Sequence, residues 1–159
     1  MLAFQIYDYA NGARIETMRE IHNLPITALL YIPRVEYIVT GAKDGIIRVW
    51  NIHRHLLYEY GAVNSCIVGL GFISGRTPFI LSCTQEGEAK LWSVEKSAVQ
   101  HTWHLKDECV GVGVIEEALF YTATKKGLTV WNTNNFSQTF NSTQYVLPAL
   151  SQNYSLQKD

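Results

Sequence analysis

Two histidines and a following cysteine form the feature of this sequence that most resembles a metal site. His101 and His104 are three residues apart and precede Cys109, and imidazole and thiolate are both zinc ligands. The segment has no second cysteine pair, however, and a continuous strand would direct the two histidines to opposite faces. Ordinary loop or core histidines are therefore the favoured interpretation, with a zinc site as the alternative.

Other reactive side chains occur where surface turns are expected. His53-Arg54-His55 follows a strand-like run, and Glu116-Glu117 is typical of a hairpin turn. The sequence has no G-x-S-x-G or H-E-x-x-H motif, phosphate-binding glycine loop or paired-carboxylate motif. We therefore predict a protein that is not an enzyme and needs no cofactor; a metal-dependent hydrolase would require stoichiometric metal to co-purify.

The charge balance argues against a polyanion or a membrane surface as partner. The 159 residues include 13 Lys and Arg against 14 Asp and Glu, a net charge of −1, and no apolar run approaches the ~20 residues of a membrane span. Hydrophobic residues make up 47% of the chain, which excludes general disorder. We expect an ordered, soluble protein that binds neither nucleic acid nor membrane.

The three cysteines and the N-terminus favour a reducing compartment. Cys66, Cys83 and Cys109 are an odd number without a C-x-x-C pair, in segments where cysteine behaves as a small hydrophobic residue. The first residues lack the basic and apolar regions of a secretory signal. We predict buried thiols and a cytoplasmic location.

An aromatic residue recurs at a regular interval. Trp50, Trp92 and Trp131 are 42 and 39 residues apart, and Tyr7 holds the same place in a similar segment 43 residues before Trp50. Such a period indicates a repeat architecture. We expect each of these aromatic residues to face inward and to pack one sheet against the next.

A hydroxyl residue and a glycine, five residues apart, precede each tryptophan. The pairs are Thr40 and Gly45, Ser82 and Gly87, and Thr122 and Gly127. An apolar run lies before each pair and an alternating run after it, so the glycine occupies a hairpin turn that needs positive φ. With a further strand-like run at each end, every unit is predicted to have four antiparallel strands, giving an all-β fold.

These units resemble the blades of the WD-repeat β-propeller family. The first unit has the family's polar residues in His22, Thr40, Asp44 and Trp50, which the resemblance implies form a structural polar chain. The second unit departs from the pattern at Ala62 and Glu86. The third has His104 and Thr122 but Lys126 in the turn, so we expect Trp131 to be held mainly by packing.

Propellers close with four to eight blades, whereas this chain has room for three units and a fragment. We therefore expect an incomplete arc, and a piece or shortened isoform of a longer propeller protein. The predicted divisions are outer strands of a partial blade (1–21), three full blades (22–60, 61–103 and 104–140) and a loosely ordered tail (141–159).

The resemblance implies a non-catalytic scaffold that binds other proteins or peptides. The turn residues before the acidic position are the candidates for partner contact: Lys43, Gln85 and Lys125. The alternative is a truncated product without independent function, stable only with missing blades or a partner. Open blade faces would also permit self-association.

Overall fold

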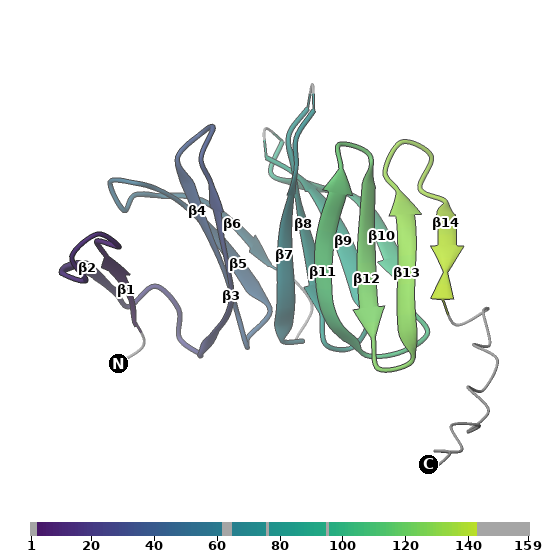
Figure 1. The fold of residues 1–159 in the computed structure, drawn as a ribbon, viewed down its shortest axis with the longest axis horizontal. Helices are drawn as coiled ribbons and strands as arrows, with labels where there is room; N and C mark the ends of the chain where they lie inside the picture. The colour runs from purple at the N-terminus through teal and green to yellow at the C-terminus, as the bar shows by residue number, and fades with distance from the viewer. Residues whose placement is uncertain (1–2, 62–64, 76, 95, 143–159) are drawn as a thin grey trace, which may run out of the picture.

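Fourteen β-strands account for most of the computed structural model, which describes residues 3–61, 65–75, 77–94 and 96–142. They form one two-stranded sheet and three four-stranded sheets, arranged side by side in an open arc (Figure 1). All strand pairs are antiparallel and join neighbours in the sequence, as short hairpin turns require.

We call the two-stranded sheet the half-unit and the four-stranded sheets the first, second and third units. The half-unit contains β1 (Ala3–Tyr7) and β2 (Arg14–Arg19). The first unit contains β3 (Ile26–Ile32), β4 (Tyr37–Ala42), β5 (Ile46–Asn51) and β6 (Leu56–Gly61). The second contains β7 (Ile67–Ile73), β8 (Phe79–Thr84), β9 (Glu88–Ser93) and β10 (Ala98–His104). The third contains β11 (Cys109–Glu116), β12 (Leu119–Thr124), β13 (Gly127–Asn132) and β14 (Gln138–Asn141).

The predicted aromatic repeat coincides with a repeat in the strand ladder. The pairing register shifts by one residue just before Tyr7, Trp50 and Trp131, and the strand facing Trp92 carries the same shift. A β-bulge of this kind increases the local twist and redirects the side chain beside it. The four aromatic residues therefore occupy equivalent places in their sheets.

The three repeat tryptophans each pack against the preceding unit. Trp50 lies in one buried cluster with Met18 of the half-unit, Trp92 is tilted against Tyr60 with ring centroids 5.0 Å apart, and the ring centroid of Trp131 is 6.3 Å from that of Trp103. The hydrophobic core is thus distributed over the interfaces between neighbouring sheets.

Glycines on β7 allow the innermost strands to approach closely. A Cβ atom at Gly69 would lie 2.8 Å from Cγ1 of Val112, and one at Gly71 would lie 3.0 Å from Cγ2 of Val114. Real Cβ atoms rarely approach other atoms this closely, so the spacing of β7 and β11 depends on these two residues.

The half-unit differs from the prediction for its aromatic residue. Tyr7 was expected to face inward like the tryptophans, but its side chain is 54% exposed and donates a hydrogen bond to Gln5. The expectation is wrong because β1 pairs only with β2 and lacks the two inner strands that complete the other sheets.

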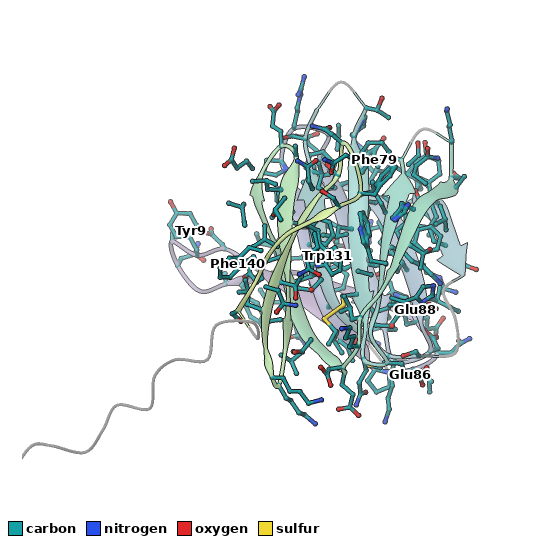
Figure 2. All side chains as sticks on the ribbon, turned by 90° about the vertical axis from the view of Figure 1, so that its right-hand side faces the viewer. Tyr9, Phe79, Glu86, Glu88, Trp131 and Phe140 are labelled. Atoms are coloured by element: carbon teal, nitrogen blue, oxygen red, sulfur yellow. A yellow bond between two sulfur atoms is a disulfide. The ribbon has the colours of Figure 1, made fainter. Side chains whose placement is uncertain are left out.

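The cysteines also differ from the prediction of three thiols. Cys83 on β8 and Cys109 on β11 form a disulfide that links the second and third units, shown in yellow in Figure 2, and Cys66 remains free. Both paired residues are buried, and their positions on neighbouring strands of different sheets bring them together.

The strand ends differ slightly from the predicted divisions. β6, β10 and β14 each extend one residue beyond the predicted unit, to Gly61, His104 and Asn141. The divisions between units stay predictions, and nearly all of the predicted tail lies outside the described residues. Among the described residues, no helix is both long and apolar enough to cross a membrane.

Candidate functional site

The hydroxyl of Thr40 is the centre of a buried polar chain in the first unit. Trp50 Nε1 donates to Thr40 Oγ1 at 3.0 Å, and His22 Nε2 lies 2.8 Å from the same oxygen. Thr40 is fully buried and His22 nearly so. The strands β4 and β5 place Thr40 and Trp50 together, and the loop before β3 supplies His22.

Counting protons assigns the direction of these bonds. If His22 Nε2–H donates, Thr40 Oγ1 accepts two hydrogen bonds and its own proton points to the Arg48 carbonyl, 3.4 Å away. Among the described residues, His22 Nδ1 has no hydrogen-bond partner. In this tautomer the unpaired His22 Nδ1 atom is an acceptor. In the other tautomer it would be an unpaired, buried N–H donor.

The environment of His22 favours its neutral form. Burial lowers the pKa of His22, and the nearby positive charge of Arg48 lowers it further, while the carboxylate of Asp44 acts in the opposite direction. A neutral imidazole in this position forms a structural hydrogen bond rather than serving as a surface charge.

Asp44 was predicted to belong to the polar chain of His22, Thr40 and Trp50, but its carboxylate bonds elsewhere. Its Oδ1 atom accepts a hydrogen bond from the Ile46 backbone N–H at 3.0 Å. The carboxylate therefore stabilises its own turn, where Gly45 adopts a φ of 79°.

The second and third units retain the central pair of this chain. Trp92 Nε1 donates to Ser82 Oγ at 2.8 Å, and Trp131 Nε1 donates to Thr122 Oγ1 at 2.9 Å. The expectation that packing mainly holds Trp131 is therefore incomplete, because a buried hydroxyl satisfies its indole N–H. Ala62, the predicted departure in the second unit, lies outside the described residues.

The residue equivalent to His22 in the third unit is Leu105 rather than His104. His22 lies four residues before the start of β3, and Leu105 lies four residues before the start of β11. His104 ends β10 with its side chain 74% exposed, and its Nδ1 atom is 3.6 Å from Oε1 of Glu88. The prediction differed by one residue because β10 is longer than the sequence pattern indicated.

The three predicted partner-binding residues lie in equivalent turns at one end of the sheets, the lower rim in Figure 1. Lys43, Gln85 and Lys125 are all exposed. The backbone N–H groups of Lys43 and Gln85 bond to the loops before β3 and β7, which fixes these turns. Lys125 Nζ donates to Glu108 at 2.9 Å, and this contact raises the pKa of Lys125.

The candidate zinc ligands are separated in the structure. His101 stacks on Phe136 with ring centroids 4.1 Å apart, His104 is exposed, and Cys109 is bonded to Cys83. Within the described ranges, no three His, Cys, Asp or Glu side chains lie close enough together to hold a metal ion.

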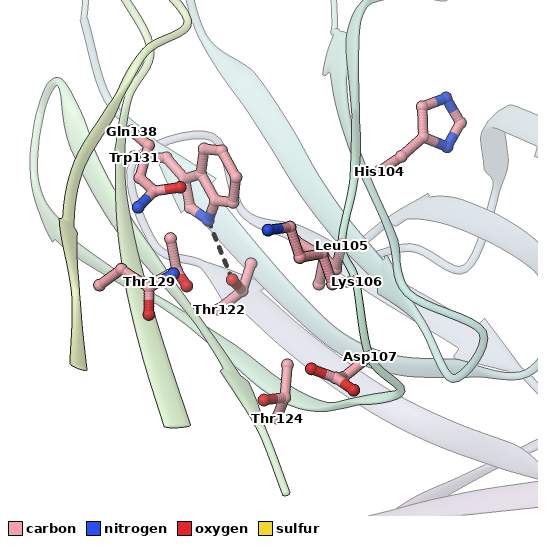
Figure 3. A pocket seen from close by; sticks show the side chains of 10 residues that line it. His104, Leu105, Lys106, Asp107, Thr122, Thr124, Thr129, Trp131 and Gln138 are labelled. Carbon is pink, nitrogen blue, oxygen red and sulfur yellow. Dashed lines mark hydrogen bonds between the residues drawn. The ribbon is translucent and has the colours of Figure 1, made fainter. Parts of the chain in front are cut away.

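A polar pocket of about 200 Å³ beside Trp131 was not predicted (Figure 3). Lys106 extends from the β10–β11 loop toward Trp131 and Thr122, while Thr129 and Gln138 lie on β13 and β14. The sequence did contain a signal for this pocket. Arg48 and Thr129 each lie two residues before a repeat tryptophan, and the smaller threonine leaves space that the arginine fills.

These features define the fold as a partial β-propeller, an open arc of four-stranded antiparallel blades. Residues 15–51, which include β2 and most of the first unit, match the family model described as WD domain, G-beta repeat. Four-stranded antiparallel sheets, each with its tryptophan against the preceding sheet, extend that architecture to the second and third units.

One curated protein and two solved structures resemble the chain at low sequence identity. Human WD repeat-containing protein 97 is 23% identical over 92 residues, which are 58% of this chain and 6% of that protein. The β-propeller domain of Myceliophteria thermophila Cps50 (Swd1) has a TM-score of 0.67 at 14% identity, covering 76% of this chain and 40% of that one. The structure of U3-55K gives a TM-score of 0.77 at 17% identity, covering 86% of this chain and 44% of that one. The chain thus spans less than half the length of each of these proteins.

Proposed function

We propose that this protein is a non-catalytic scaffold that binds other proteins or peptides through the turns at one end of its sheets. The WD-repeat propeller fold commonly mediates protein interactions, which supports this assignment. We also propose a cytoplasmic location, where reducing conditions would oppose the Cys83–Cys109 bond.

The observation that carries the proposal is the repetition of one exposed turn on a fixed frame. Lys43, Gln85 and Lys125 project from equivalent hairpins, and buried tryptophan–hydroxyl pairs hold the strands beneath them. Binding residues are commonly carried by loops on such a rigid frame. Three such turns at regular spacing suit an extended partner.

The proposal is tested by affinity capture from cell extract with a triple variant, K43A/Q85A/K125A. We expect the variant to lose proteins that the wild-type chain retains, while its thermal unfolding stays unchanged because all three side chains are exposed. The matched control is R34A/E117A, with both exposed residues in turns at the opposite end. Equal capture by the wild type and both variants would contradict a role for these turns.

A second candidate is a truncated product that is stable only with additional blades or a partner. The two-stranded half-unit favours it, because β1 has no inner neighbour among the described strands. The exposed tyrosines of this region, Tyr7 and Tyr9, add apolar surface. Cooperative thermal unfolding of the isolated chain would favour the scaffold, whereas a dye-binding state without fixed packing would favour the truncated product.

A further inference from the structure

The pocket beside Trp131 exists because two large side chains of the first unit are replaced in the third. In the first unit Arg48 crosses the corresponding space, donating to Glu59 at 2.7 Å and to the Ile21 carbonyl. Thr129 stands in the place of Arg48, and Asn141 pairs with it as Glu59 pairs with Arg48. The space that a guanidinium fills in one unit is open in the other.

The pocket contains polar groups that no described residue uses. Neither Lys106 Nζ, Thr129 Oγ1 nor the side-chain amide of Gln138 forms a hydrogen bond or ion pair within the described part of the chain. Thr122 Oγ1 accepts a hydrogen bond from Trp131. Three uncommitted donors therefore surround the opening, with Trp131 and Leu105 as apolar walls.

The charges around the pocket favour an anion. Asp107 is the one carboxylate among the described residues that line the pocket, and it is paired with Lys126. The neighbouring Glu108 is paired with Lys125, and Glu88 with Lys90 at 2.8 Å. Among the described residues of the lining, Lys106 thus carries the unpaired charge, and its ammonium would repel a second cation such as an arginine from a partner.

We propose that this pocket binds the carboxylate of an acidic side chain on a partner peptide. Lys106 acts as the counter-ion, Thr129 and Gln138 donate hydrogen bonds, and the methylene groups of the side chain pack on Trp131. A pocket of about 200 Å³ suits one side chain rather than a cofactor. The inference rests on the proposed scaffold function and names the chemistry of one part of the partner.

The test is an NMR titration of the full 159-residue chain that follows the indole N–H signal of Trp131. The probe is Ac-Ala-Ala-Glu-Ala-Ala-NH2, with its Glu-to-Gln counterpart and inorganic phosphate as comparisons. We expect a saturable shift with the Glu peptide and none with the Gln peptide. K106M should weaken binding by about tenfold, the loss expected for one charge-assisted hydrogen bond, whereas K96M, at the other end of the sheets, should leave it unchanged.

A second variant removes the pocket without removing a donor from the loop. T129R should fill the space as Arg48 does in the first unit and abolish the shift, while T139R adds the same charge on an exposed residue of β14 and should not. A response to phosphate alone, equal shifts with both peptides, or no effect of K106M and T129R would overturn the proposal. If these results appear while K43A/Q85A/K125A still loses its partners, the pocket assignment fails and the scaffold function stands.

Discussion

The first and third units share one hydrogen bond and differ in what surrounds it. Trp50 and Trp131 each donate to a buried threonine, Thr40 or Thr122, from equivalent strands. The first unit adds His22 and Arg48 to that threonine–tryptophan pair, whereas the third replaces them with Leu105 and Thr129 and leaves a pocket. The indole–hydroxyl pair is therefore the constant element of the fold, and the residues around it are free to differ.

The largest effect is expected from removing a tryptophan that lies between two sheets. Trp50→Ala should cost about 3–5 kcal/mol of unfolding free energy, because it leaves a cavity against the half-unit and also deletes the indole bond. Trp131→Ala should cost less, since Trp131 is only half-buried and can leave more space to water. Urea unfolding of both variants measures the difference, and a larger loss for Trp131→Ala would contradict the comparison.

Removing the threonine hydroxyl that accepts the indole bond should destabilise the first unit more than the third. Thr40→Val leaves two buried N–H groups unpaired, those of Trp50 and His22, and should cost about 2–4 kcal/mol. Thr122→Val leaves only the indole of Trp131 unpaired and should cost about 1–2 kcal/mol. Equal losses in parallel urea unfolding experiments would show that His22 adds nothing to the first unit.

The close contact of β7 with β11 predicts a smaller effect from a single methyl group. Gly69→Ala should destabilise the chain by about 1–3 kcal/mol, because the new Cβ would meet both the side chain and the backbone N of Val112. Gly111→Ala is the matched control, since nothing lies within 4 Å of a Cβ there. Thermal unfolding should separate the two variants, and a similar midpoint for both would show that β11 can move aside.

The smallest effect is a pH dependence confined to the first unit. The pKa of His22 is lowered in the folded chain, so below about pH 6.5 the unfolded chain binds a proton that the folded chain does not. Its contribution to stability is complete above that pH and is lost as the pH falls toward the lowered pKa. His22→Leu, which copies the third unit, should give a flatter dependence of unfolding free energy between pH 7 and pH 5. An unchanged slope would contradict the neutral assignment.

Periodicity predicted the strands well because each unit depends on local alternation and a turn glycine. The sequence from Ile15 to Ile21 fits either a strand or a short helix, and in the structure most of it belongs to β2 (Arg14–Arg19). The tryptophan partners Thr40 and Thr122 were also predictable, since two adjacent strands with a short turn fix their register.

Features that depend on contacts between units were not predictable from one sequence. The pairing of Cys83 with Cys109 and the exposure of Tyr7 both follow from how sheets meet. The shift from His104 to Leu105 follows from the length of β10, whose polar end gave no clear boundary. The pocket at Lys106 could not be predicted because residues from four strands and a loop line it.

The role of Asp44 was not predictable for a different reason. A turn aspartate can bond to a distant histidine or to its own turn, and the same residue type serves both. In this chain the backbone N–H of Ile46 lies within reach and takes the carboxylate.

Hydrogen exchange of the indole N–H groups tests most directly whether buried tryptophan–hydroxyl pairs hold the units. The account predicts slow exchange at Trp50, Trp92 and Trp131 in the native chain, with faster exchange only at Trp92 in the variant Ser82→Ala, which removes one acceptor. Exchange of all three at the rate of free indole, while the chain remains folded by circular dichroism, would contradict it.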